Sequence, residues 1–205
     1  MAYTTIDDGS EYFQIATWTG NGSTQSITNG GNSNLQPDWI WTKRRDSSGQ
    51  NHHGIDSTRG ASKAMVLNDV DGEATKSNGI TAFNSDGFSV GTDTNFNNNT
   101  TTYVGWQWVA NGGTTSSNSD GSITSTVQAN TTAGFSIVTY TGTGSAATVG
   151  HGLGVKPGVI IIKARTTPTG GVHFGTSQGN WIVYHQGTAS DPETDLLLLN
   201  TDGAR

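Results

Sequence analysis

The sequence contains no cysteine and carries little charge. The absence of cysteine among the 205 residues excludes disulfide bonds and thiolate metal ligands. Charged residues make up only 13% of the chain, which argues against a disordered chain kept open by charge repulsion. The formal net charge is −6, and Lys43-Arg44-Arg45 is a short basic run. We therefore expect a folded protein that binds no nucleic acid.

Long hydrophobic runs are also missing. The longest are residues 159–162 and 196–199, far short of the roughly 20 apolar residues that cross a bilayer. Residues 1–8 show no basic stretch followed by an apolar one, so we expect no signal peptide. These features predict a protein without membrane association that is made and assembled in a cytoplasm.

Patterns typical of catalysis are scarce. Glutamate occurs only at Glu11, Glu73 and Glu193, and no carboxylate pair suited to glycoside hydrolysis stands out. The many glycines are not followed by helical patterns, so neither a serine nucleophile elbow nor a phosphate loop is indicated. The sequence predicts no catalytic residue, no cofactor-binding residue and no metal ligand, and hence no enzyme.

Two polar motifs have a structural and a functional interpretation. The adjacent pair His52-His53 invites a metal, but neighbouring strand residues point to opposite faces, which favours structural or surface roles. Histidines 151, 173 and 185 lack ligand spacing. Asp56 and Arg59 are interpreted as an ion pair that fixes a loop, with a receptor contact as the alternative.

The segment from Asp69 to Glu73 is similar to a calcium loop. An EF-hand would need acids two residues before Asp69 and near the twelfth position, where the chain has Leu67 and Asn78. A hairpin turn is therefore favoured over a calcium site.

The strongest feature is an internal repeat. Phe13-Gln-Ile-Ala-Thr-Trp-Thr-Gly matches Phe135-Ser-Ile-Val-Thr-Tyr-Thr-Gly, and residues 35–43 match residues 155–163. A repeat of this length fixes domain boundaries before strands are assigned. It predicts an N-terminal lead-in and two repeats joined by a linker rich in Gly, Ser, Thr and Asn, with the boundaries 1–11, 12–111, 112–133 and 134–205. Within the linker, residues 122–127 could add as a strand to either repeat.

Alternation and turn signals predict the fold class. Phe13, Ile15 and Thr17 share one face of a strand, with Ala16 and Trp18 on the other. Asp-Gly dipeptides, which suit tight hairpins, begin at positions 71, 86, 120 and 202. We predict an all-β protein of tandem antiparallel β-sandwiches, of jelly-roll or lectin-like type, without helices beyond a single turn near Ser62.

The second repeat is predicted to be incomplete. Nothing after residue 203 matches residues 79–109, which correspond to about three strands. The missing strands would belong to a longer chain, which we favour, or come from another subunit. Trp39-Ile40-Trp41 and residues 159–162 are apolar on both faces, so each is expected to be central in a sandwich or covered by a neighbouring subunit.

The six tryptophans are candidate platforms for sugar rings. Trp106 and Trp108 lie on one face of a predicted strand. Two such rings are more typical of a core than of a ligand platform, and a trimer interface would use them in the same way.

Several strings resemble a known repeat domain. They are residues 56–63 (Asp-Ser-Thr-Arg-Gly-Ala-Ser-Lys), 83–91 (Phe-Asn-Ser-Asp-Gly-Phe-Ser-Val-Gly), 103–108 (Tyr-Val-Gly-Trp-Gln-Trp), 140–157 (Tyr-Thr-Gly-Thr-Gly-Ser through Gly-Val-Lys-Pro), 180–185 (Asn-Trp-Ile-Val-Tyr-His) and 197–201 (Leu-Leu-Leu-Asn-Thr). Together they resemble a repeat domain of virion proteins from marine tailed phages, including those of cyanobacteria. The resemblance implies a structural or tail-fibre-like protein with a lectin-like sandwich fold, and it transfers no catalytic residue. The second repeat of that family continues through further strands, from which this sequence departs.

The resulting expectation is a non-enzymatic virion structural protein, a fibre or surface appendage that attaches to a host-surface glycan or receptor. Its expected partners are other virion proteins, further copies of itself, with a trimer favoured, and a host-surface glycan. The alternatives are a capsid-decorating or tail-associated protein without ligand and a polysaccharide depolymerase.

Overall fold

A computed structural model describes residues 6–166 and 179–201. Strands dominate this part of the chain, and every pairing between named strands is antiparallel. Helical structure is confined there to single turns at Gly9–Glu11, Thr94–Asn97 (α1) and Pro192–Thr194. None of these is long enough or apolar enough to cross a membrane. The all-β class predicted from the sequence is therefore confirmed.

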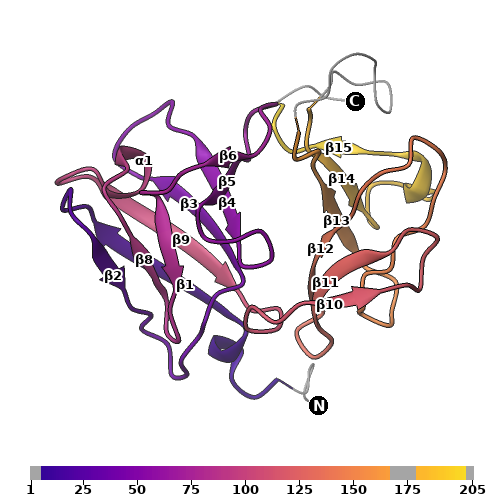
Figure 1. Cartoon of the computed structure of the whole chain (residues 1–205), viewed down its shortest axis with the longest axis horizontal. Coiled ribbons are helices and arrows are strands. Elements are labelled where there is room, and N and C mark those ends of the chain that lie inside the picture. Colours follow the sequence, from indigo (N-terminus) through magenta and orange to yellow (C-terminus); the bar gives the residue numbers. More distant parts are fainter. Residues whose placement is uncertain (1–5, 167–178, 202–205) are drawn as a thin grey trace.

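The first part of the chain contains a six-stranded sheet (Figure 1). Its strands in spatial order are β1 (Phe13–Thr19), β9 (Thr102–Trp108), β3 (Trp39–Arg44), β4 (His52–Asp56), β5 (Lys63–Val66) and β6 (Ala74–Thr75). β9 pairs with β1 along one edge and with β3 along the other. β9, the last of these strands in the sequence, thus lies between the earlier strands β1 and β3.

A three-stranded sheet covers one face of the larger sheet. It consists of β2 (Gln25–Ile27), β8 (Phe88–Val90) and β7 (Ile80–Phe83). Both sheets contribute to one hydrophobic core, in which Ile40, Ile55 and Phe88 are fully buried. Burying each such side chain contributes about 1.5–3 kcal/mol to folding.

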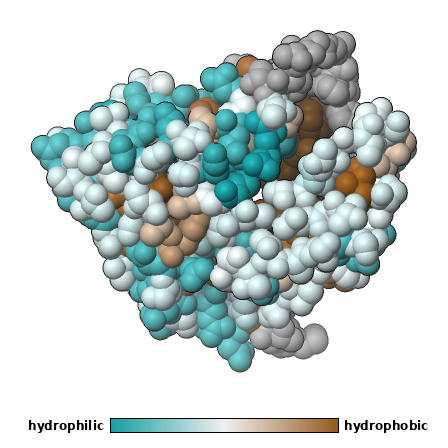
Figure 2. Space-filling view, in the orientation of Figure 1, coloured by the Kyte–Doolittle hydropathy of each residue, from teal (hydrophilic) through white to brown (hydrophobic). Residues whose placement is uncertain are grey.

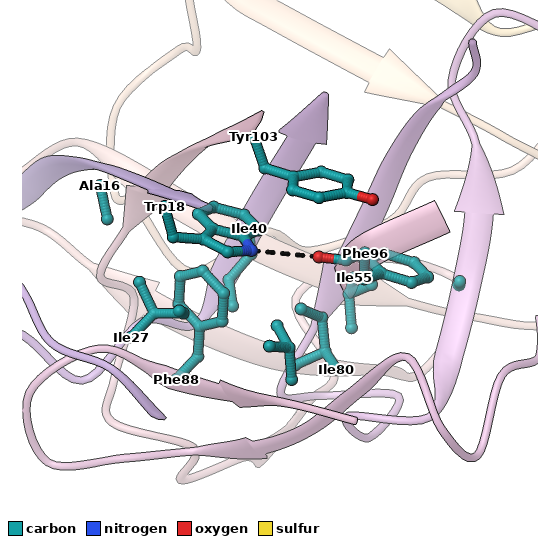
Figure 3. Packing of buried hydrophobic residues seen from close by; sticks show 11 residues of the cluster. Ala16, Trp18, Ile27, Ile40, Ile55, Ile80, Phe88, Phe96 and Tyr103 are labelled. Atoms are coloured by element: carbon teal, nitrogen blue, oxygen red, sulfur yellow. Dashed lines mark hydrogen bonds between the residues drawn. The ribbon is translucent and has the colours of Figure 1, made fainter. Parts of the chain in front are cut away.

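Trp18 shows how this core is ordered. Its indole stacks on the ring of Tyr103, with centroids 5.3 Å apart, and meets Phe88 edge to face. Its Nε1–H donates to the carbonyl oxygen of Phe96 over 3.1 Å, so the polar end of the buried ring is satisfied (Figure 3). The predicted alternation of β1 is confirmed, with Ala16 and Trp18 facing inward.

Three of the four Asp-Gly dipeptides lie between antiparallel partners. Those at Asp71, Asp86 and Asp120 join β5 to β6, β7 to β8, and β10 (Ser116–Asn118) to β11 (Ser125–Asn130). The segment that is similar to a calcium loop is therefore the β5–β6 connection. The dipeptide at 202 lies outside the described residues.

Residues 112–133 differ from the predicted linker. They contain β10 and the whole of β11, which form a three-stranded sheet with β12 (Phe135–Thr139). Ser125 and Val127 are buried, and the extended backbone is paired on both sides of β11. Serine and threonine fit a pleated strand once neighbouring strands satisfy the backbone. The strand expected at residues 122–127 is found in part as β11, which belongs with β12.

The second part repeats a three-strand arrangement of the first. β13 (Val159–Ile162), β14 (Ile182–His185) and β15 (Leu197–Leu198) are paired in the order in which β3, β4 and β5 are paired. Gly54 lies between Trp41 and Met65 in the first set, and Val183 lies between Ile161 and Leu197 in the second. The sequence repeat also aligns Trp41 with Ile161. The strand pairings and the sequence repeat therefore agree on the same register.

The two sets differ at β13. β3 has neighbours on both edges, whereas β13 pairs with β14 alone among the described strands. Its four residues are between 39% and 50% exposed, while Ile40 is fully buried. Among the described residues β13 is therefore not central in a sandwich, because no described strand takes the places of β9 and the small sheet, and the alternative of cover by a neighbouring subunit stays a prediction.

The first and second parts contact each other through a small hydrophobic cluster. Trp181, which precedes β14, packs with Met65 and Leu67. Its Nε1–H donates to the carbonyl oxygen of Val66 over 2.8 Å. Gln128 of β11 adds a polar link, because its Nε2 donates to the Oγ of Ser57 over 2.8 Å.

Candidate functional site

The outer face of the six-stranded sheet carries two rows of large apolar side chains. Phe13, Trp108 and Trp39 are cross-strand neighbours in one row, and Ile15, Trp106 and Trp41 are neighbours in the next. These six side chains are called the aromatic face below. They lie opposite the core, because the alternate residues of β1, β9 and β3 point inward.

The structure corrects the interpretation of Trp106 and Trp108 as core residues. Both are half-buried on the outer face, whereas Tyr103, Gly105 and Gln107 form the inward side of β9. A Cβ atom at Gly105 would lie 3.3 Å from Cζ3 of Trp18 and 3.4 Å from Cζ of Phe88. The core side of β9 is therefore already filled by rings from other strands.

The rings of the aromatic face hold one another in tilted contacts. Phe13 and Trp108 have centroids 4.9 Å apart at 52°, and Trp41 meets Trp106 edge to face at 6.2 Å. Phe135 of β12 extends the first row, since its ring stacks on Trp108 at 6.3 Å. Edge and offset contacts of this kind are preferred by aromatic rings and fix their planes.

The aromatic face is open to different degrees along its length. Phe13 is 37% exposed and Ile15 is 52% exposed at the β1 end. At the other end Trp39 and Trp41 pack against the cluster of Met65, Leu67 and Trp181. Figure 2 shows a mostly hydrophilic or neutral surface with several separate hydrophobic patches, one of them in the recess between the first and second parts. Exposed apolar side chains such as Phe13 and Ile15 can mark an interaction surface.

Trp41 has a fixed polar contact. Its Nε1–H donates to Nδ1 of His52 over 2.9 Å, which requires the histidine to be neutral at that nitrogen. Burial lowers the pKa of His52, and Lys43 lowers it further. The indole N–H groups of Trp106 and Trp108 have no acceptor among the residues described, so they are available to a ligand.

The two adjacent histidines lie on opposite faces, as predicted. His53 is buried against Phe96, with ring centroids 4.9 Å apart. Burial lowers the pKa of His53 to about 4, with Lys76 contributing in the same direction. His151 and His185 accept backbone hydrogen bonds at Nδ1, and His173 lies outside the described residues. Where the chain is described, no three His, Asp or Glu side chains gather as metal ligands.

The predicted ion pair of Asp56 and Arg59 is confirmed, with 2.5 Å between the carboxylate and Nε. It is part of a larger cluster, because Glu73 pairs with Arg59 at 3.1 Å and with Arg165 at 2.9 Å. Burial alone would raise the pKa of Glu73, but hydrogen bonds from Arg165 and Arg59 outweigh it and the pKa is lowered. The Glu73 carboxylate is thus held ionised and links the two parts. Separately, Glu193 forms an exposed ion pair with Lys156.

Asp38 is a structural residue that the sequence interpretation missed. Its fully buried carboxylate accepts from Ser57 Oγ at 2.6 Å and from the backbone N–H groups of Ala110, Gly112 and Gly113 at 2.7–2.8 Å. It ties the start of β3 to the chain that leaves β9. The repeat alignment could have singled out this residue, because it places Gly158 in the second copy where the first copy has Asp38. A buried carboxylate at this position is therefore specific to the first repeat.

Two cavities lie away from the aromatic face. One, of about 510 Å³, is formed by residues 148–152 and 154–156 with Asp120 and Gly121. The other, of about 230 Å³, is lined by His53 and Lys76 among others. The aromatic face offers flat apolar surfaces on which a ligand can stack.

Comparison with known proteins identifies a family without an assigned role. No match was found among curated proteins or among solved structures. A family described as a domain of unknown function, DUF7483, matches residues 8–205. The chain therefore belongs to the DUF7483 family.

Proposed function

We propose that this protein is a non-enzymatic structural component of a virion, a fibre or surface appendage, whose aromatic face contacts glycans on the host surface. The observation that carries the proposal is the pair of half-exposed aromatic rows on one face of a continuous sheet. The virion assignment rests on the resemblance of its sequence strings to phage repeat domains.

Sugar rings suit this face chemically. A pyranose presents a flat patch of C–H groups that packs on an aromatic ring, and its hydroxyls accept from indole N–H groups. The neighbouring Trp41–His52 and Phe13–Trp108 contacts hold the rings in place, so little side-chain entropy is lost on binding. Each contact is weak, and copies in an oligomer, with a trimer favoured, would add through effective concentration.

The proposed architecture is a pair of tandem β-sandwiches. The supporting observations are the shared core between the six-stranded and three-stranded sheets and the common register of β3–β5 and β13–β15. The boundary 12–111 of the first unit remains the one predicted from the repeat. The second unit is extended at its start to include β10 and β11, because these strands pair with each other and with β12.

The alternatives assign different roles to the same surfaces. A capsid-decorating or tail-associated protein would use the aromatic face against another virion protein and bind no sugar. The symmetry of the density that this chain occupies in a particle separates that arrangement from a fibre. A depolymerase would require paired carboxylates, whereas Glu73 is occupied by two arginines.

The proposal is tested by binding to a purified envelope polysaccharide of a marine cyanobacterium. Wild-type protein should bind saturably, and Trp106→Ala should weaken binding at least about ten-fold. Tyr140→Ala is the matched control, because Tyr140 is 44% exposed and lies outside the aromatic face. Absence of binding, or equal losses in both variants, would refute the glycan contact. Release of reducing ends would instead support the depolymerase.

A further inference from the structure

We infer that the cavity lined by His53, on the core side of the six-stranded sheet, binds a neutral polyhydroxylated ligand the size of one sugar residue. This cavity, here called the His53 cavity, has a volume of about 230 Å³ and is lined by residues of β4, β5, β6 and α1. The volume is below the roughly 300–1,000 Å³ of pockets for drug-sized ligands, so a single ring fits and an oligosaccharide does not. The inference goes beyond the aromatic face and does not depend on glycan binding there.

His53 is a buried polar group without a partner. Its side chain is in the interior, since the residue is only 4% exposed, and its ring packs on Phe96. Neither of its ring nitrogens forms a hydrogen bond with residues 6–166 or 179–201. Buried polar groups are normally paired, and the open space beside this one is the His53 cavity. A hydroxyl of a bound ligand would supply the missing hydrogen bond.

The pairing of β4, β5 and β6 explains why space remains beside this imidazole. His53 faces Val66 across β4 and β5, and Ala64 faces Ala74 across β5 and β6. These four residues line the cavity, and the two alanines leave room that larger side chains would fill. The methyl groups form a small apolar wall, on which the C–H groups of a sugar ring can pack.

Two asparagines at the cavity offer both kinds of hydrogen-bonding group. Asn51 accepts at Oδ1 from Asn68 over 3.1 Å, and its own Nδ2 has no acceptor in the described chain. Asn95 of α1 donates from Nδ2 to Asp93 over 2.8 Å, and its Oδ1 has no donor there. A hydroxyl group both donates and accepts. A ligand with several hydroxyls therefore matches this mixed set better than one with acceptors alone.

Charge favours a neutral ligand. Lys76 lines the cavity, but its Nζ lies 3.9 Å from Oδ2 of Asp93 and so already has a counter-charge. Asp71 also lines the cavity and is exposed to water. Burial lowers the pKa of His53 to about 4, so the imidazole is neutral near pH 7. An ionic ligand would lose its hydration beside this buried neutral ring, which is costly, whereas a hydroxyl is readily satisfied.

The test is an NMR titration of the whole protein near pH 7 with D-glucose, D-galactose and D-mannose, one at a time. At least one sugar should shift the imidazole signals of His53 saturably, at millimolar concentration because one ring makes few contacts. Glycine, a zwitterion, and inorganic phosphate are the charged probes and should leave these signals unchanged. A saturable shift with either charged probe would overturn the neutral ligand class. No saturable shift with any sugar would overturn the site.

A variant pair locates the contact. Ala74→Phe should weaken sugar binding at least about ten-fold, because its ring occupies the cavity. Thr75→Phe is the matched control, since Thr75 is the next residue of β6, is also exposed and points to the other face of the sheet. It should bind sugar as the wild type does, and equal losses in the two variants would overturn the location. If Ala74→Phe fails to fold, the titration of wild-type protein still decides the question.

The same spectra separate this inference from the proposed function. The indole N–H signals of Trp106 and Trp108 report sugar on the aromatic face, and the imidazole signals of His53 report sugar in the cavity. A sugar that shifts the indole signals alone would overturn the cavity site and leave the proposed function standing. A sugar that shifts only the imidazole signals would support the cavity site.

Discussion

The indole ring of Trp39 lies across Gly54, so that a Cβ atom at residue 54 would come within 2.7 Å of Cη2 of Trp39. The same Cβ would lie 2.9 Å from Cδ2 of Leu67, which belongs to the cluster joining the two parts. In the second set the pairing places Val183 between Ile161 and Leu197. The absence of a side chain at Gly54 is therefore matched to the large tryptophan beside it.

This relationship predicts that Gly54→Ala is destabilising. The added methyl must displace Trp39 or Leu67, and overpacking of this kind costs about 1–3 kcal/mol. Denaturant unfolding measures the loss. Gly30→Ala is the control, because a Cβ there meets nothing within 4 Å, and it should leave the free energy of unfolding nearly unchanged. Equal effects in the two variants would contradict the packing of Trp39 over Gly54.

The two sides of the six-stranded sheet should respond differently to truncation of tryptophan. Trp18→Ala removes a ring that is only 8% exposed and leaves the carbonyl of Phe96 without its donor, so a loss of about 3–5 kcal/mol is expected. Trp106→Ala removes a half-buried ring from the outer face and should cost clearly less. Chemical denaturation of both variants checks the order, and the reverse order would place Trp106 in the core.

Acidification should destabilise the fold through His53. Its pKa is about 4 in the folded protein, against about 6.5 when unfolded. Between these values the unfolded chain binds the proton more readily, so the stability present above about pH 6.5 is lost as pH falls towards 4. Lys76, His52 and Lys43 near this ring also lower its pKa, whereas the negative charge of Asp93 raises it.

The matched variant is His53→Gln, which removes the titrating group. Its free energy of unfolding should fall less steeply than that of the wild type over the same pH window. The difference between the two proteins should be constant above pH 7. Parallel curves throughout would show that the pKa of His53 is the same in the folded and unfolded states, against its burial in the fold.

The cluster around Glu73 should control how firmly the two parts are joined. Glu73→Gln removes the charge that pairs with Arg59 and Arg165 and should increase proteolytic cleavage between the parts. Because the pKa of Glu73 is lowered in the folded state, its contribution is present above the unfolded pKa and is lost as pH falls through the folded one. Glu193→Gln, which breaks the exposed pair with Lys156, should leave cleavage unchanged.

Much of the fold was predictable from local patterns. Alternation located β1, β9 and the strands on either side of Asp86-Gly87, and the repeat located β13. The full extent of β4 was not predicted, because Gly54 to Asp56 adds little apolar alternation to the pair His52-His53. β10 was missed because serine and asparagine in a Gly-rich stretch resemble a linker.

The candidate site was less predictable, for a reason visible in β9. Both of its faces carry aromatic residues, Tyr103 on one and Trp106 and Trp108 on the other, so the pattern cannot show which side is inward. Which side of β9 faces the core depends on the three-stranded sheet of β2, β8 and β7. Its core residues Ile27, Ile80 and Phe88 come from distant positions in the sequence. Only the assembled core decides that Tyr103 is buried and that the tryptophans face outward.

The central claim is that the aromatic face binds sugar without cleaving it. A crystal structure of the protein with an oligosaccharide prepared from the bound polysaccharide tests this most directly. An intact sugar stacked on Trp106 or Trp108, with a hydroxyl accepting from an indole N–H, is expected. A sugar held instead in the cavity formed by residues 148–152 and 154–156, or a cleaved product beside a pair of carboxylates, would contradict it.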